Sequence, residues 1–92
     1  MTTYYVKSNG TDIPFTSRKT AILFALSILN RMYEYSNVYI YYKNAKGKKT
    51  FYGEIVYEGM GLVYFYKGLG RKMGTQVKKD GSLDGKIRSM YL

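Results

Sequence analysis

The chain has 92 residues with 15 Lys and Arg against 6 Asp and Glu, a formal net charge of +9 at pH 7, and neither Cys nor His. This length fits one domain with a modest core, and the missing residue types exclude disulfide frameworks, zinc sites and catalysis by Ser-His or Cys-His groups. The charge indicates a polyanionic partner (a nucleic acid, an acidic protein surface or an anionic membrane), or else serves only to keep the protein solvated.

The first predicted element is a β-hairpin within residues 3–15. Residues 4–7 form a Tyr-Tyr-Val-Lys run that is typical of a strand. Asn9-Gly10 then signals a two-residue turn, because both residues tolerate positive φ. Pro14 lies in the return arm and cannot donate a ladder hydrogen bond, so we expect this arm to be an edge strand or only an extended segment.

A helix is predicted over residues 17–35, with a hydroxyl of Thr16 or Ser17 capping its first turn. At 100° per residue its apolar side chains form one broad arc, which should cover the sheet. The arc consists of Ala21, Ile22, Ala25, Leu26, Ile28, Leu29, Met32 and Tyr33. Leu23 and Phe24 flank the polar side. They lie either beneath the N-terminal hairpin or the C-terminal tail, or in a patch for a dimer mate or partner.

Three antiparallel strands are predicted within residues 38–67, at 38–43, 50–58 and 62–67. Loops at 45–48 and 59–61, each containing Gly, would close the two hairpins. The resulting register gives four side-chain pairs: Tyr42 with Phe51, Tyr41 with Tyr52, Ile55 with Phe65, and Glu54 with Tyr66. This register sets apolar residues opposite one another and Tyr opposite Tyr, so it is self-consistent.

Side chains of a strand alternate between the faces of a sheet, so the two faces of this meander should differ in chemistry. One face is apolar and would form the core with the helix. It carries Val38, Ile40, Tyr42, Phe51, Ile55, Tyr57, Val63 and Phe65. The other, which we call the tyrosine face, carries Tyr39, Tyr41, Tyr52, Glu54, Tyr64 and Tyr66.

Residues 68–92 form a basic, Gly-rich tail. It contains a predicted strand at 75–79, a turn at Asp80-Gly81, and a last strand at 86–92. In that last strand Ile87, Met90 or Leu92 would pack onto a sheet edge. The predicted fold class is therefore α+β: a small single domain over residues 1–92 with an N-terminal β-hairpin and one long α-helix packed on a three- to five-stranded antiparallel β-meander.

Few residues offer catalytic or metal-binding chemistry. Asp80 and Asp84 are too few ligands for Ca²⁺ or Mg²⁺, and the glycines of residues 68–74 match neither a dinucleotide fingerprint nor a P-loop. We therefore expect no enzyme activity, no cofactor, no metal and no catalytic residue. The enzymatic alternative is a metal-independent ribonuclease in which Glu54 acts as base among the tyrosines. Otherwise Glu54 only accepts hydrogen bonds from tyrosine hydroxyls.

The expected function is binding of nucleic acid, as a single strand or as the guide or template of a complex. Tyr rings on an open sheet can stack on bases while flanking cations contact phosphates. The predicted contact residues are Tyr39, Tyr41, Tyr52, Tyr64, Tyr66, Lys46, Lys48, Lys49, Arg71 and Lys72. The tyrosines also have a structural explanation. Cross-strand Tyr pairs stabilise sheets, and a dimer mate or the tail could bury this face.

The alternative function is that of a phage-type inhibitor that docks on a host nucleic-acid enzyme, as anti-CRISPR proteins do. This hypothesis depends on size, charge and composition, in which Lys exceeds Arg and Tyr and Ile are frequent. Tyr-rich surfaces give contact area at little entropic cost, and a strand edge offers β-augmentation. The sequence has no apolar run long enough to span a bilayer and no signal-like N-terminus, so we expect a cytoplasmic protein without a membrane partner.

Overall fold

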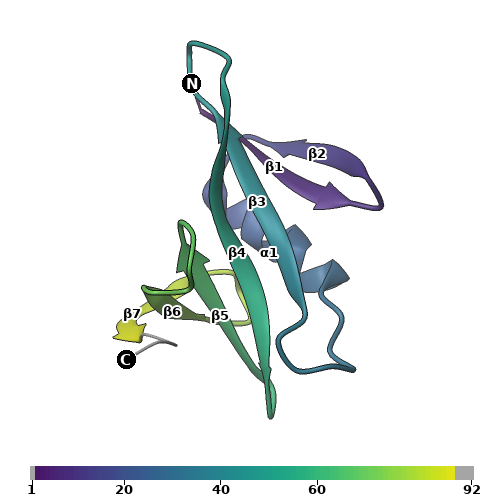
Figure 1. The fold of residues 1–92 in the computed structure, drawn as a ribbon, viewed down its shortest axis with the longest axis vertical. Helices are drawn as coiled ribbons and strands as arrows, with labels where there is room; N and C mark the ends of the chain where they lie inside the picture. Colours follow the sequence, from purple (N-terminus) through teal and green to yellow (C-terminus); the bar gives the residue numbers. More distant parts are fainter. Residues whose placement is uncertain (1, 89–92) are drawn as a thin grey trace.

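The computed structural model describes residues 2–88, with side chains described for residues 2–85. Its elements are β1 (Thr3–Ser8), β2 (Thr11–Phe15), α1 (Arg18–Ile28), β3 (Asn37–Lys43), β4 (Lys49–Gly59), β5 (Leu62–Lys67), β6 (Gly74–Val77) and β7 (Leu83–Arg88). The seven strands form one antiparallel sheet in the order β2-β1-β3-β4-β5-β6-β7 (Figure 1). The fold is α+β but dominated by the sheet, so the prediction of three to five strands is wrong.

The sheet is wider than predicted because a hairpin extends the central meander on each side. The Asn9-Gly10 turn is confirmed, with φ angles of 51° and 78°. Strand β1 pairs with β3 as well as with β2, so that Tyr5 lies opposite Tyr41. Strand β2 is left at the edge of the sheet, as Pro14 predicts.

Helix α1 packs on one face of the sheet, behind β3 and β4 in Figure 1. Its residues Ala21, Ile22 and Ala25 are fully buried. The strands complete this core with Val6, Val38, Ile40, Ile55, Val63, Phe65 and Val77. Burial of these side chains is the main favourable contribution to folding. The described residues include no helix long and apolar enough to cross a bilayer.

The helix begins as predicted but ends seven residues early, at Ile28 rather than at residue 35. Ser17 caps its first turn by accepting the N–H of Thr20 at 3.2 Å. After the helix, the side chain of Asn30 accepts the N–H of Met32 at 2.9 Å. This local hydrogen bond competes with helix continuation. Met32 and Tyr33 are consequently 83% and 67% exposed, and the prediction that they join the buried arc is wrong.

The first meander hairpin contains a β-bulge at Tyr52. Ile40 lies opposite Gly53, whereas Tyr41 lies opposite Phe51, so Tyr52 is the extra residue. The predicted pairs of Tyr42 with Phe51 and of Tyr41 with Tyr52 are therefore wrong by one position. Because side chains alternate, this shift moves Tyr52 to the helix side of the sheet and Phe51 to the opposite side.

The second hairpin closes with a shorter turn than predicted. Met60 and Gly61 form a two-residue turn with φ angles of 54° and 77°, and Gly59 lies opposite Leu62. An irregularity before Gly59 absorbs the difference in loop length. The predicted pairs of Ile55 with Phe65 and of Glu54 with Tyr66 are confirmed. The tyrosine face is therefore phased correctly along this hairpin.

The C-terminal hairpin packs its turn against the helix. The Lys78–Ser82 turn is held by the N–H of Lys78, which donates to the carbonyl of Ser82 at 2.9 Å. A Cβ added at Gly81 would lie 2.7 Å from Cγ of Leu23, so this turn contacts the helix. Strand β7 begins at Leu83, before the predicted residue 86. The predicted packing of Ile87, Met90 or Leu92 falls on side chains outside the described residues.

The cross-strand pair of Tyr66 and Gly74 generates a prediction for stability. Tyr66 packs its ring over Gly74, where an added Cβ would lie 2.4 Å from a ring carbon. We expect Gly74→Ala to lower the free energy of unfolding by about 1–3 kcal/mol, because the buried ring must move. Urea denaturation measures this loss. Gln76→Ala on the same strand serves as control and should change stability by less than about 0.5 kcal/mol; equal losses would contradict the packing.

Asp80 in the β6–β7 turn generates a prediction for pH dependence. The hydroxyl and N–H of Ser82 donate to its carboxylate at 2.6 and 2.9 Å and, with nearby Lys19 and Lys78, lower the pKa of Asp80. A lowered pKa contributes stability above the unfolded-state value, and this contribution is lost as pH falls through the folded-state value. We expect Ser82→Ala to raise the pKa of Asp80 and to destabilise the protein at neutral pH but not at strongly acidic pH. NMR titration of the Asp80 carboxyl measures the shift, and an unchanged titration would refute the assignment.

Candidate functional site

The tyrosine face contains four of its five predicted tyrosines. Tyr39, Tyr41, Tyr64 and Tyr66 lie on the face opposite the helix, whereas the bulge turns Tyr52 to the helix side. Their exposure differs greatly. Tyr39 is 42% exposed and Tyr66 is fully buried. The predicted face is thus not one uniform contact surface.

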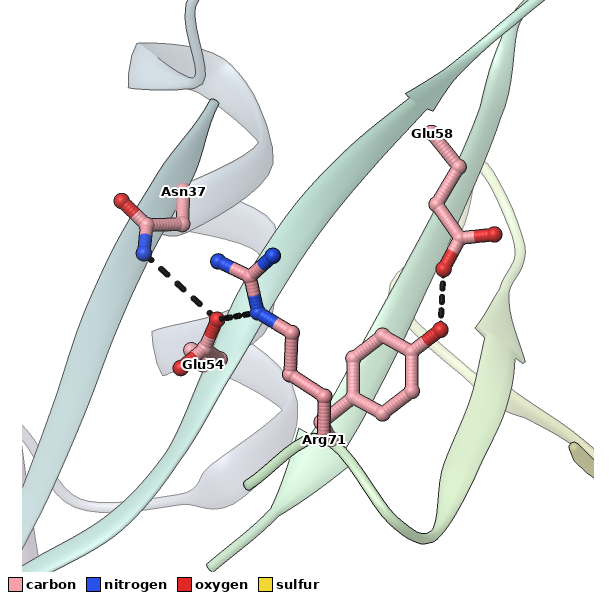
Figure 2. A network of polar contacts seen from close by, with 5 residues as sticks. Asn37, Glu54, Glu58 and Arg71 are labelled. Atoms are coloured by element: carbon pink, nitrogen blue, oxygen red, sulfur yellow. Dashed lines mark hydrogen bonds and ion pairs between the residues drawn. The ribbon is translucent and has the colours of Figure 1, made fainter. Parts of the chain in front are cut away.

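The segment between β5 and β6 folds over part of this face. Figure 2 shows Arg71 reaching from that segment toward Glu54, with Asn37 on the other side. The Nε atom of Arg71 lies 2.5 Å from Oε1 of Glu54, and Nδ2 of Asn37 lies 3.5 Å from the same oxygen. The hydroxyl of Tyr66 donates to Glu58. Arg71 and Tyr66 therefore stabilise the fold in this half of the face through an ion pair and a hydrogen bond.

The other half of the tyrosine face carries aromatic and cationic side chains that contact one another. Phe51 packs edge-on against Tyr39 and Tyr41, with ring centroids 5.8 and 5.6 Å apart. The ammonium of Lys49 lies 4.6 Å from the Tyr41 ring centroid and pairs with Asp12. Such cation–π contacts are worth about 0.5–1 kcal/mol at exposed sites. Lys49 and Tyr41 therefore already contact each other in the absence of a ligand.

The helix side of the sheet contains a cleft that we call the aromatic cleft. Its volume is about 320 Å³, and it is lined by Thr2, Tyr4, Tyr42, Phe51, Tyr52, Lys67 and Gly68. Of these residues, Phe51 packs its ring on the opposite face against Tyr39 and Tyr41. The Tyr52 ring lies 5.3 Å from the Tyr4 ring and 5.9 Å from the Tyr42 ring, edge-on in both cases. Three strands thus supply three tyrosine rings to one cleft.

Backbone geometry fixes the Tyr52 ring in the aromatic cleft. The β-bulge points Tyr52 toward the helix side, where its ring packs 5.4 Å from that of Phe65. The N–H of Gly68 donates to the carbonyl of Tyr52 at 2.9 Å and so holds the bulge. Tyr4 and Tyr42 are cross-strand neighbours in β1 and β3. The rings are therefore positioned by the sheet rather than by a mobile loop.

The electrostatics of the aromatic cleft favour a flat ligand that is neutral or anionic. The ammonium of Lys67 lies 6.0 Å from the Tyr52 ring centroid. None of the described residues that line the cleft carries a carboxylate. A cationic ligand would meet Lys67 without a compensating charge, whereas an aromatic ring could stack on Tyr and an anion could pair with Lys67.

Sequence reasoning missed Tyr4, Tyr42 and Lys67 as site residues. It assigned Tyr42 to the core and Tyr4 only to a strand. The signal was present in the doublets Tyr4-Tyr5 and Tyr41-Tyr42. Adjacent residues of a strand point to opposite faces, so each doublet necessarily places one Tyr on the helix side.

The remaining predicted contact residues are scattered around this region. Lys46 and Lys48 are exposed in the β3–β4 turn, and Lys72 is exposed between β5 and β6. The ring of Phe24 lies 5.2 Å from that of Phe15 in the N-terminal hairpin. Leu23 remains 38% exposed beside the C-terminal turn.

No group of three or more His, Cys, Asp or Glu side chains within the described part of the chain could hold a metal ion. Comparisons with protein-family models, curated proteins and solved structures found no match.

The ion pair of Arg71 and Glu54 generates a prediction that tests whether Arg71 stabilises the fold. Both side chains are largely buried, at 21% and 9% exposure. Arg71→Ala leaves a buried carboxylate with a weak partner, so we expect it to lower the free energy of unfolding by about 1–3 kcal/mol. Lys72→Ala at the exposed neighbouring position should change stability by less than about 0.5 kcal/mol. Chemical denaturation compares the two variants, and a neutral Arg71→Ala would argue against a structural ion pair.

Proposed function

We propose that the protein binds single-stranded nucleic acid without catalysis, and that a base stacks in the aromatic cleft. The observation that carries this proposal is the cleft itself, in which Tyr4, Tyr42 and Tyr52 surround a volume of about 320 Å³ beside Lys67. Stacking of a base on an aromatic side chain contributes about 1–3 kcal/mol. Each base has a flat aromatic face, so this contribution requires no particular sequence.

Cations around the cleft supply the contacts that phosphates need. Lys67 lines the cleft, while Lys46 and Lys48 lie in the β3–β4 turn at the top of Figure 1. Lys43 points to the opposite face, where its ammonium lies 5.4 Å from the Tyr5 ring centroid. Contacts of about three lysines with phosphates would give a slope of log K against log salt of roughly −2 for a single strand. The change of this slope when one cleft lysine is removed distinguishes a built phosphate contact from general attraction by the net charge of +9.

Unpaired bases fit the aromatic cleft better than a duplex does. Bases in a double helix stack on each other, so their faces are not accessible to protein rings. Single strands expose those faces, and proteins that bind them combine aromatic side chains with a basic groove. We therefore expect single-stranded DNA or RNA to bind more tightly than the duplex of the same sequence.

The proposal includes no catalysis because Glu54, the base of the ribonuclease alternative, is not positioned to act on a base bound in the cleft. Its Oε1 atom lies 2.5 Å from Nε of Arg71, on the face opposite the aromatic cleft. This carboxylate is engaged with Arg71 and lies away from the bound base. Lys67 and the tyrosines suffice for binding.

Replacement of the cleft residues tests the proposal. We expect Tyr42→Leu to weaken binding of a labelled single-stranded oligonucleotide by roughly 5- to 100-fold, which is the loss of one stacked base. Lys67→Gln should weaken binding and make the salt slope shallower by roughly 0.7. Fluorescence anisotropy at several salt concentrations measures both effects.

Two exposed positions serve as matched controls for this test. Tyr33→Leu removes a tyrosine that is 67% exposed and does not line the cleft, and Lys72→Gln removes an exposed cation. Each should change affinity by less than about twofold, since surface contacts outside an interface contribute little. Equal losses in the cleft variants and the controls, or equal affinity for single strand and duplex, would refute the proposal.

A further inference from the structure

The opposite end of strand β4 carries a second surface of different chemistry. In Figure 1 the β3–β4 turn lies at the top, and the β4–β5 turn lies at the bottom near the segment that follows α1. This segment pairs with β4, since the N–H of Tyr35 donates to the carbonyl of Tyr57 at 2.5 Å. The N–H of Tyr57 donates in turn to the carbonyl of Ser36 at 2.9 Å. The two segments therefore form one continuous end of the molecule.

Exposed apolar side chains gather at this end. Met60 is 95% exposed, Met32 is 83% exposed, and Tyr33 is 67% exposed. Leu62 adds a partly exposed side chain directly after the turn. Met and Tyr are enriched at protein interfaces, and the flexible Met side chain adapts to different partner surfaces.

A basic cleft, as we call it, lies next to these side chains. It has a volume of about 360 Å³, and it is lined by Leu26, Arg31, Gly61, Val63, Val77, Lys78 and Lys79. Three aliphatic residues and three cations thus line the same cleft, and none of its described lining residues carries a carboxylate. The guanidinium of Arg31 lies 5.9 Å from the Tyr57 ring centroid, which restrains its position.

Nearby carboxylates offset only part of the positive charge of these three cations. The side chain of Glu34 packs against Gly59, where an added Cβ would lie 3.0 Å away. Asp80 accepts the hydroxyl and N–H of Ser82 at 2.6 and 2.9 Å and also attracts Lys78, so it offsets part of one of the three charges. The basic cleft therefore presents positive charge beside an aliphatic surface, which is complementary to a ligand that is both acidic and aliphatic.

We infer that the basic cleft binds an acidic peptide segment of a partner protein, with an aliphatic side chain in the cleft and carboxylates on Arg31, Lys78 and Lys79. Among the described residues, no aromatic ring on which a nucleobase could stack lines this cleft. A second copy of the chain would bring the same three cations and a further net charge of +9 to this surface. An acidic peptide fits both the charge and the aliphatic lining.

This inference extends the proposed function to two partners. Lys67 lines the aromatic cleft and Val63 lines the basic cleft, four residues apart on β5, so a rise of about 3.3 Å per residue separates these two positions by roughly 13 Å. A nucleic acid at the aromatic cleft and a peptide at the basic cleft can therefore bind together. The protein would act as an adaptor between a nucleic acid and an acidic protein segment.

The test compares two variants that lose the same charge. The first replaces Arg31, Lys78 and Lys79 with Ala, and the second replaces Lys46, Lys48 and Lys67 with Ala. The probe is a short fluorescein-labelled peptide of Glu and Leu, and anisotropy at physiological salt gives its affinity. We expect the first variant to weaken peptide binding at least about tenfold and the second to weaken it less than about twofold. Single-stranded oligonucleotide binding should show the reverse order.

Further measurements keep the inference open to refutation. Met32→Ser with Met60→Ser changes two exposed side chains, so the fold should persist while affinity for the Glu-Leu peptide falls. A peptide with Ser in place of Leu should bind at least about tenfold more weakly. Equal losses in the two charge variants, or equal affinity for the Ser peptide, would mean general charge attraction and would overturn the inference. So would a homodimer in sedimentation that the first charge variant dissociates, or tighter binding to phosphatidylserine vesicles than to the peptide.

Discussion

The β-bulge at Tyr52 determines which side chains share a face near the β3–β4 turn. On one side of it Ile40 pairs with Gly53, and on the other Tyr41 pairs with Phe51. Gly53 permits the close approach, because a Cβ there would lie 2.5 Å from the carbonyl oxygen of Tyr66 and 2.8 Å from the Phe65 ring. An extra residue in one strand moves every side chain beyond it to the other face. The bulge thus creates both the aromatic cleft and the aromatic cluster on the opposite face.

The tyrosines consequently divide into structural and accessible groups. Tyr66 is fully buried, packs over Gly74 and donates to Glu58, so it stabilises the junction of β5 and β6. Arg71 closes the same region by pairing with Glu54. Tyr4, Tyr42 and Tyr52 instead border a cleft. A composition rich in tyrosine therefore does not by itself identify a binding face, because position relative to the bulge decides the role of each ring.

The turn and cap signals in the sequence predicted individual boundaries well, whereas the strand pairing and the end of the helix were not predictable from the hydrophobic pattern. The Asn9-Gly10 turn and the Ser17 cap depend on a few adjacent residues, and both are observed. The bulge depends on packing between Gly53 and residues of β5, which no local pattern encodes. The helix ends early because the Asn30 side chain binds a backbone N–H, a competition that hydrophobic periodicity does not detect. The aromatic cleft was missed for the same reason as the bulge, because its rings share a face only through strand pairing.

The positive charge of the chain and its two clefts act over different distances. A net charge of +9 attracts any polyanion, so it accelerates encounter without selecting a partner. Selection must come from contacts at short range, and there the clefts differ: one is lined by tyrosine rings, the other by Leu26, Val63 and Val77. Lys67 and Val63, which line the two clefts, are separated by roughly 13 Å along β5, whereas charges are screened beyond about 8 Å at physiological salt. An anion bound in one cleft therefore weakens the electrostatic attraction at the other only in part, so two acidic partners can bind at the same time.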